Sequence, residues 1–159
     1  MSIAPTLRHY LHDAGVDYDL IQHAHSHSTP ETARTAHLSR SNLAKAVVVH
    51  HIDGFAMSVV PGDRNVNLSA LQDILHYRLR LARESEIESL FPDCEAGAIP
   101  PMGFLYGLKT IVDHDLSDVS EVFFEAGDHE TVVRVSHPGF EHLMQDTEHA
   151  PVSCTPYQH

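Results

Sequence analysis

Two apolar segments joined by a tight turn constrain the fold of this chain more than any other feature. Residues 43–51 begin Leu-Ala-Lys-Ala-Val-Val-Val, and residues 55–60 read Phe-Ala-Met-Ser-Val-Val. Asp53-Gly54 lies between them and is a strong signal for a β-hairpin turn. The first segment is apolar on both strand faces, which is typical of a strand that is buried on both sides. We therefore expect a buried hairpin at the centre of the fold.

One lysine lies inside the first strand of this hairpin. Lys45 shares a strand face with Leu43, Val47 and Val49, and burying an unpaired ammonium group is unfavourable. Its side chain is therefore paired, placed at the mouth of a pocket, or extended along apolar surface with its head in water. In a pocket, it would hold a phosphate or carboxyl oxygen or polarise a carbonyl group. The pattern alone leaves the surface role and the site role open.

The remaining patterns predict a single α+β domain over residues 1–159. Helices are expected over residues 5–14, 29–37, 68–76, 85–90 and 138–145, and strands over 16–22, 43–51, 55–60, 65–67, 77–82, 109–113, 121–125 and 131–136. Thr29 is the expected N-cap of the second helix. Hairpins rather than regular crossovers connect most strands, which indicates a mixed, largely antiparallel sheet. Residues 146–159 are expected to form a polar, loosely ordered tail.

Charge is distributed unevenly along the chain. The net charge is −12, and all of it arises from residues 85–159, because residues 1–84 hold eight basic and eight acidic residues. An acidic protein is a poor general binder of nucleic acid, which argues against DNA as a partner. If the protein meets a phosphate backbone, the first half is the expected contact surface. No apolar segment approaches the ~20 residues of a membrane span, and no signal peptide is evident, so we expect a cytoplasmic protein.

Histidines and cysteines are the other residues that bind metals or act as nucleophiles. The chain has 15 histidines, among them the alternating His23, His25 and His27, but it has no HExxH or CxxC motif. Cys94 and Cys154 are interpreted as free thiols outside any nucleophile motif. GxSxG, GxGxxG and the P-loop are also absent. We therefore expect neither a metal nor another cofactor, and histidines that are exposed to solvent.

Two loops are candidates for the wall of a pocket around Lys45. Residues 92–107 are rich in glycine and proline, and a long irregular loop inside a compact domain is more often functional than accidental. Gly97 permits a close backbone approach, and Pro100 and Pro101 then restrict the chain. Residues 127–130 form a turn between two expected strands, from which His129 could reach a cleft. Taken alone, the first loop has low specificity and can be a structural turn, and an ordinary hairpin-tip histidine is the favoured interpretation of His129.

Four segments together resemble the YbaK/prolyl-tRNA-synthetase-associated editing domain family. They are Lys45 inside its apolar strand, the sequence Met57-Ser58-Val59-Val60-Pro61, the sequence Gly97-Ala98-Ile99-Pro100-Pro101-Met102-Gly103, and the sequence Ala126-Gly127-Asp128-His129. The similarity extends from about residue 23 to about residue 143. It implies a barrel-like arrangement of the sheet with flanking helices, and an aminoacyl-tRNA deacylase that acts as a free-standing protein.

The resemblance also implies roles for individual residues. Lys45 is the key site residue, the G-x-x-x-P motif maps to Gly97 and Pro101, and His129 lines the pocket. The expected substrate-binding residues are Ala98, Ile99, Pro100, Met102 and Gly127. The family uses no bound metal, and its substrate is the acceptor end of a mischarged tRNA, classically tRNA for proline. The neighbouring ribose hydroxyl is expected to assist catalysis, and a rigid proline-walled pocket would reject the correct amino acid by size.

The tRNA-binding surface is a separate expectation. Arg78 and Arg80 alternate in an expected short strand and would contact the phosphate backbone from one face. Two other classes of protein stay open at the level of sequence: a non-catalytic module of the same fold that binds a tRNA end or small ligand, and a histidine-rich metal-binding protein. The sequence does not indicate the amino acid, the tRNA, the group that activates water or the oligomeric state.

Overall fold

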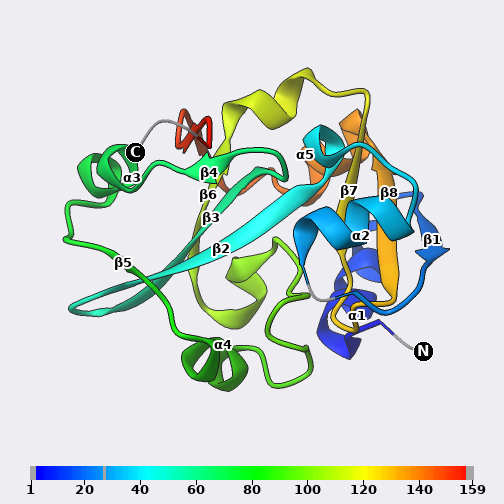
Figure 1. Cartoon of the computed structure of the whole chain (residues 1–159), viewed down its shortest axis with the longest axis horizontal. Coiled ribbons are helices and arrows are strands. Elements are labelled where there is room, and N and C mark those ends of the chain that lie inside the picture. Colours follow the sequence, from blue (N-terminus) through cyan, green and yellow to red (C-terminus); the bar gives the residue numbers. More distant parts are fainter. Residues whose placement is uncertain (1–2, 27, 157–159) are drawn as a thin grey trace.

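A computed structural model describes residues 3–26 and 28–156 (Figure 1). Its helices are α1 (Pro5–Ala14), α2 (Thr29–Thr35), α3 (Leu68–Leu75), α4 (Glu84–Leu90) and α5 (His137–Leu143), with 3-10 helices at Arg40–Asn42, Gly103–Tyr106 and His114–Asp118. Its strands are β1 (Asp19–Gln22), β2 (Ala44–His51), β3 (Gly54–Pro61), β4 (Asn65–Val66), β5 (Arg80–Leu81), β6 (Lys109–Asp113), β7 (Glu121–Glu125), β8 (Thr131–Ser136), β9 (Glu148–Ala150) and β10 (Ser153–Cys154).

The predicted hairpin is the centre of the largest sheet. β2 and β3 pair antiparallel over their whole length, with Lys45 opposite Val60, and the sheet has the order β5-β2-β3-β6-β9. β3–β6 and β6–β9 are parallel, whereas β2–β3 and β2–β5 are antiparallel. The prediction of a mixed, largely antiparallel α+β fold is therefore confirmed. In the described part of the chain, β5 and β9 remain edges, so the sheet does not close into a barrel.

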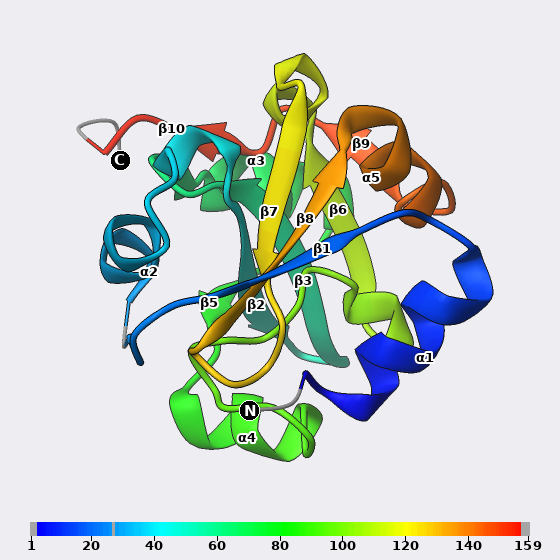
Figure 2. The same ribbon diagram turned by 90° about the vertical axis from the view of Figure 1, so that its right-hand side faces the viewer.

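A second, three-stranded sheet brings the end of β7 close to the start of β2. Its order is β1-β8-β7, and all its pairs are antiparallel. A parallel bridge joins Leu43, just before β2, to Phe123 in β7. Figure 2 shows β7, β8 and β1 lying across the sheet that contains β2 and β3. Residues that flank Leu43 and Phe123 therefore meet although they are about 80 positions apart in the sequence.

Both faces of the hairpin are covered, as its apolar pattern predicts. Val48, Met57 and Val59 belong to the main core, which also includes residues of α1, β7 and α5. Val49 and Val60 belong to a second cluster on the opposite face, with Leu71 of α3. Alternate residues of a strand point to opposite faces, so a strand between two apolar layers is apolar throughout. The rigid hairpin thus supports any residue placed at its rim.

Capping residues explain where the first helices begin and end. Gly15 has φ 66° and ends α1 in the left-handed conformation that glycine adopts without strain. The N-cap of α2 is Ser28, whose side chain accepts a hydrogen bond from the Glu31 N–H, and the helix therefore begins at Thr29. The prediction of Thr29 as N-cap was therefore wrong by one residue. In the described residues, no helix is long and apolar enough to cross a membrane.

The C-terminal segment is ordered over the residues that the structure describes, so the prediction of a loose tail was wrong there. β9 pairs with β6, and β10 pairs with β4. Asp113 is 1% exposed, and its carboxylate accepts hydrogen bonds from the N–H groups of Val152 and Ser153 and from the Ser153 hydroxyl. A buried carboxylate that receives three hydrogen bonds fixes the segment that donates them. Residues 157–159 lie outside the described residues.

Candidate active site

Lys45 and Gly97 line one pocket of about 240 Å³, which we call the lysine pocket. Its walls come from the start of β2, the start of α2, the inner face of α4, the loop after α4 and the end of β7. The lining residues are Ser28, Thr29, Leu43, Ala44, Lys45, Ala46, Ile87, Ala96, Gly97, Ile99 and Glu125. The two segments that the sequence singled out, the lysine strand and the Gly97 loop, therefore line one pocket.

Lys45 is half-buried and its amino group is held in place. The amino group donates a hydrogen bond of 2.7 Å to the carbonyl oxygen of Arg64. Burial lowers the pKa of Lys45, the nearby charge of Arg40 lowers it further, and Asp63 partly opposes both effects. Of the three placements that its sequence pattern left open, Lys45 combines two. Its amino group has a hydrogen-bond partner, and its side chain lines a pocket. It also borders a second cavity of about 400 Å³ beside α3 and β5.

The C-terminal segment supports Arg64, whose carbonyl group holds Lys45. The Arg64 Nε–H donates a 2.7 Å hydrogen bond to the Ser153 hydroxyl, which in turn donates to Asp113. Arg64 Nε also lies 3.7 Å from the carboxylate of Asp115. Two hydrogen bonds, from Lys45 to Arg64 and from Arg64 to Ser153, therefore connect the C-terminal segment to the pocket. They fix the position of the lysine head more firmly than its own flexible stem could.

Glu125, the last residue of β7, brings a carboxylate into the same pocket. The Thr32 side chain donates a hydrogen bond to this carboxylate. The Oε2 atom is buried and has no hydrogen-bond partner among the described residues. Burial raises the pKa of Glu125 to about 7, with smaller contributions from the charges of Asp128 and Glu95, and the bond from Thr32 opposes the rise. A carboxyl group of this kind changes its charge near neutral pH.

The sequence analysis missed Glu125, although the alternation of β7 contains a signal. Phe123 and Glu125 share one strand face, and Phe123 is 7% exposed and packs with Leu43 and Val132. An acid on the same face as a buried phenylalanine, at the end of a strand, is a candidate for a pocket. That face can be recognised as buried only after β7 is placed beside Leu43, which is a tertiary contact.

The residues of the Gly97–Gly103 loop have different environments. Gly97 is exposed at the rim, and Ile99 lines the lysine pocket. Ala98 and Met102 are fully buried. Pro100 and Pro101 are also buried, and neither of them lines the lysine pocket. The loop is thus anchored by its second half. A Cβ on Gly103 would approach Thr110 Oγ1 to 2.8 Å, so the close packing against β6 requires glycine there.

His129 and Gly127 lie beside the lysine pocket rather than in its lining. His129 is 7% exposed, adopts a φ of 61°, and its ring centroid lies 5.4 Å from that of His25. Gly127 has a φ of 112°, and its carbonyl oxygen accepts a hydrogen bond from the Glu95 N–H. His129 lines a neighbouring cavity of about 410 Å³, which shares Ala96 and Gly97 with the lysine pocket.

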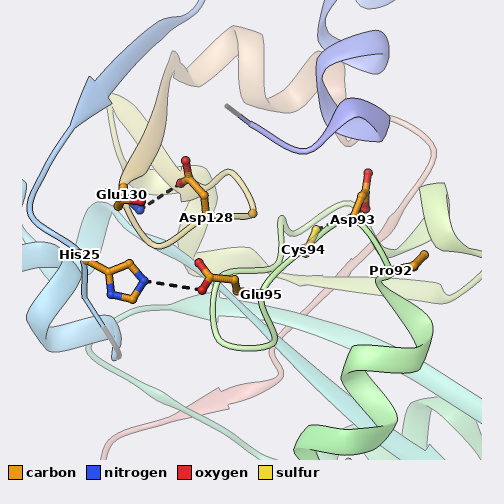
Figure 3. A pocket seen from close by; sticks show the side chains of 8 residues that line it. His25, Pro92, Asp93, Cys94, Glu95, Asp128 and Glu130 are labelled. Carbon is orange, nitrogen blue, oxygen red and sulfur yellow. Dashed lines mark hydrogen bonds and ion pairs between the residues drawn. The ribbon is translucent and has the colours of Figure 1, made fainter. Parts of the chain in front are cut away.

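A larger and strongly acidic pocket of about 680 Å³ lies next to these residues. We call it the acidic pocket, and its lining residues are His25, Pro92, Asp93, Cys94, Glu95, Gly127, Asp128 and Glu130. Figure 3 shows His25 facing Glu95, with Asp128 and Glu130 above them in the view. His25 Nε2 lies 3.6 Å from the Glu95 carboxylate. Asp128 accepts hydrogen bonds from the N–H groups of Glu130 and Thr131, which fixes the turn between β7 and β8.

The histidines and cysteines do not form a metal centre in the described residues. No group of three or more histidine, cysteine or acidic side chains there has the arrangement of a metal site. His27, one of the three alternating histidines, lies outside the described residues. Cys94 and Cys154 are free thiols, and burial raises the pKa of Cys94 to about 12. A thiol with so high a pKa is a poor nucleophile near neutral pH.

The two arginines expected to contact tRNA differ in their surroundings. Arg78 is exposed. Arg80 forms a two-pronged ion pair with Glu86, at 2.9 and 3.0 Å, within the cap of α4. The guanidinium group of Arg80 is therefore already neutralised by the protein, which leaves Arg78 as the more available cation of the pair.

The fold belongs to a known class of structures. The hypothetical protein APE2540 has 21% sequence identity to this chain and superposes with a TM-score of 0.84, over 94% of this chain and 99% of that protein. A protein described as a candidate trans-editing enzyme for prolyl tRNA synthetase has 20% identity and a TM-score of 0.82, over 96% of this chain and 99% of its own. At these identities, the likeness shows the shared fold alone.

The sequence identifies the family more specifically. The model of the aminoacyl-tRNA editing domain matches residues 23–143, which is most of the chain. The chain therefore belongs to the aminoacyl-tRNA editing domain family, and the resemblance seen in the four sequence segments is confirmed. No curated protein matches the chain in a direct sequence comparison.

Proposed function

We propose that this protein is a trans-editing aminoacyl-tRNA deacylase, which hydrolyses the ester bond between an amino acid and the wrong tRNA. The observation that carries the proposal is the lysine pocket, in which Lys45 and the Gly97 loop come together in a member of the editing-domain family. Nothing in the pocket resembles a nucleophilic triad, and its cysteine neighbour, Cys94, has a raised pKa. The pocket therefore suits direct attack by water.

The polar groups of the pocket fit the chemistry of an aminoacyl ester. Such an ester is already reactive, so a site must mainly orient it and stabilise the charge that develops on the carbonyl oxygen. Water attacks the carbonyl carbon, the bond to the ribose oxygen breaks, and that oxygen takes a proton as the tRNA leaves. Lys45 would stabilise the negative oxygen, with backbone N–H groups of the Gly97 loop beside it. The neighbouring ribose hydroxyl would assist the attack.

The size of the pocket supports a small amino acid as the group removed. A cavity of about 240 Å³ has room for a short side chain and the ester itself, while the ribose and base remain outside. Ile87 and Ile99 narrow it, and the buried Pro100 and Pro101 make the loop behind it rigid. The solved relative described for prolyl tRNA synthetase supports tRNA for proline, or a related tRNA, as the carrier.

Charge supports an approach of the tRNA from the side of α2 and the loop after it. Arg34 and Arg40 are exposed there, and Arg40 is close enough to lower the pKa of Lys45. The neighbouring cavity is lined by Glu84, Glu88 and Glu95, which would repel phosphate groups. Arg78 is a further exposed cation, between α3 and β5. A cytoplasmic location fits this proposal, because mischarged tRNA arises where translation takes place.

The test is a deacylation panel with alanyl-, cysteinyl-, seryl- and threonyl-tRNA, each carried on tRNA for proline and on its cognate tRNA. We expect hydrolysis of at least one small amino acid at a rate well above the spontaneous rate, and equal rates with and without a chelator. Binding of these tRNAs without turnover would identify a non-catalytic module and contradict the proposal. Inhibition by the chelator would instead favour a metal-dependent protein.

A further inference from the structure

Among the described residues, Glu125 is the only acidic side chain that lines the lysine pocket. We propose that the Glu125 carboxylate binds the α-ammonium group of the esterified amino acid, so that the site accepts only esters with a free α-amino group. The inference rests on the proposed function and assigns a substrate-recognition role to a residue outside the family resemblance described above. It follows from three features of the structure: the pocket that Glu125 shares with Lys45, the buried oxygen of Glu125, and the charges around it.

The first feature is that the pocket holds one cationic and one anionic side chain on different strands. Lys45 comes from β2 and Glu125 from β7. They form no ion pair with each other among the described residues, and Glu125 does not contribute to the pKa of Lys45. A ligand can therefore contact both groups at once. An aminoacyl ester has matching polarity, with a carbonyl oxygen and an ammonium group on adjacent carbon atoms.

The second feature is the state of the carboxylate itself. Thr32 donates a hydrogen bond to it, but Oε2 is buried and has no partner among the described residues. A buried acceptor without a partner is unfavourable, and it is often completed by a ligand. Thr32 is itself fully buried and hydrogen-bonded to Ser26, which restrains the hydroxyl that contacts the carboxylate.

The third feature is the charge around Glu125. Asp128 and Glu95 lie close enough to act on it, and together with burial they raise its pKa to about 7. Lys45 on β2 is the cation that lines the same pocket. Thr32 on α2, which bonds to Glu125, carries no charge. A bound cation stabilises a carboxylate that is buried among negative charges more than it stabilises a carboxylate exposed to water. Binding of the α-ammonium group would therefore favour the ionised form of Glu125.

A competing role for Glu125 is that of a general base, which would take a proton from the attacking water. A carboxylate with a pKa near 7 suits that task as well. The two roles make different predictions for a substrate without an α-ammonium group. A base accelerates hydrolysis of every ester in the pocket, whereas an ammonium-binding group acts only on esters that carry the positive charge.

The experiment compares alanyl-tRNA with lactyl-tRNA, in which a hydroxyl group replaces the α-amino group, on the same tRNA. If the panel selects another amino acid, its α-hydroxy analogue replaces lactate. We expect the wild type to favour the alanyl ester at least 10-fold in kcat/KM, mainly through KM, beyond the ratio of their spontaneous rates. Glu125→Gln should abolish that preference. Glu121→Gln, at the opposite end of β7, where the half-buried Glu121 pairs with Arg134, is the matched control and should retain it.

Each outcome has one meaning. An equal loss of kcat on both esters in Glu125→Gln, with the preference retained, would overturn the inference in favour of the general-base role. A wild type without any preference would also overturn it, while the proposed function would stand. A wild type that hydrolyses no aminoacyl ester of the panel would contradict the proposed function and the inference together. Thermal unfolding of both variants, followed by circular dichroism, confirms that they are folded.

Discussion

The lysine pocket and the acidic pocket lie against the same loop, yet only one suits an aminoacyl ester. The acidic pocket is the larger, at about 680 Å³ against about 240 Å³. It is lined by four acidic side chains and by no lysine or arginine, and His25 is already close to Glu95. The lysine pocket holds a cation fixed by Arg64 and a carboxylate whose buried Oε2 has no hydrogen-bond partner among the described residues. Size alone would therefore select the wrong site.

The difference also concerns what each pocket does in the fold. Hydrogen bonds within the acidic pocket connect parts of the protein: Asp93 accepts from the Thr6 N–H and the Tyr106 hydroxyl, and Asp128 fixes its own turn. These acids are used structurally. In the lysine pocket, Lys45 is held by the Arg64 carbonyl group, and Glu125 keeps a buried oxygen without a hydrogen-bond partner among the described residues. Such groups are the ones expected of a binding site.

The largest expected effect is that of removing the lysine. Lys45→Ala should lower single-turnover deacylation at least 100-fold, because it removes the group that stabilises the oxyanion. Lys109→Ala is the matched control, since Lys109 is the only other lysine, is exposed and pairs loosely with Glu148; its activity should be unchanged. Activity of Lys45→Ala within a few-fold of the wild type would refute the assignment of the site.

The next effect is on stability and follows from the raised pKa of Glu125. The folded state binds this proton more tightly than the unfolded chain does, so stability is lost as pH rises from about 4.5 through about 7. Between pH 5 and pH 8, the wild type should lose roughly 2–3 kcal/mol of unfolding free energy relative to Glu125→Gln. Urea unfolding at both pH values measures the difference. Parallel curves for the two proteins would show that the pKa of Glu125 is normal.

The smallest expected effect concerns the tRNA surface. Replacing Arg78 and Arg80 together with alanine should weaken tRNA binding a few-fold and reduce its dependence on salt concentration. Arg78→Ala alone should account for most of the change, because Arg80 is already paired with Glu86. Binding titrations at several salt concentrations provide the slopes. An unaltered slope in the double variant would remove this face from the docking surface.

Local patterns were sufficient to predict the hairpin, because the Asp53-Gly54 turn and the apolar strands determine the pairing of β2 with β3. They left the role of Lys45 open, and it was the family resemblance that favoured a site. The C-terminal strands were not predicted, because β9 and β10 are only three and two residues long and depend on Asp113 for their order. Glu125 was missed for a related reason: its burial depends on contacts between segments distant in sequence.

The most direct test of the account is a crystal structure with 3′-(L-alanylamino)-3′-deoxyadenosine, a stable amide analogue of the aminoacylated tRNA end. We expect the alanyl group in the lysine pocket, with its carbonyl oxygen facing Lys45, its ammonium group within 3.2 Å or so of Glu125, as charge-assisted hydrogen bonds require, and its adenosine outside. An alanyl group bound among Glu95, Asp128 and Glu130 of the acidic pocket would contradict the central claim.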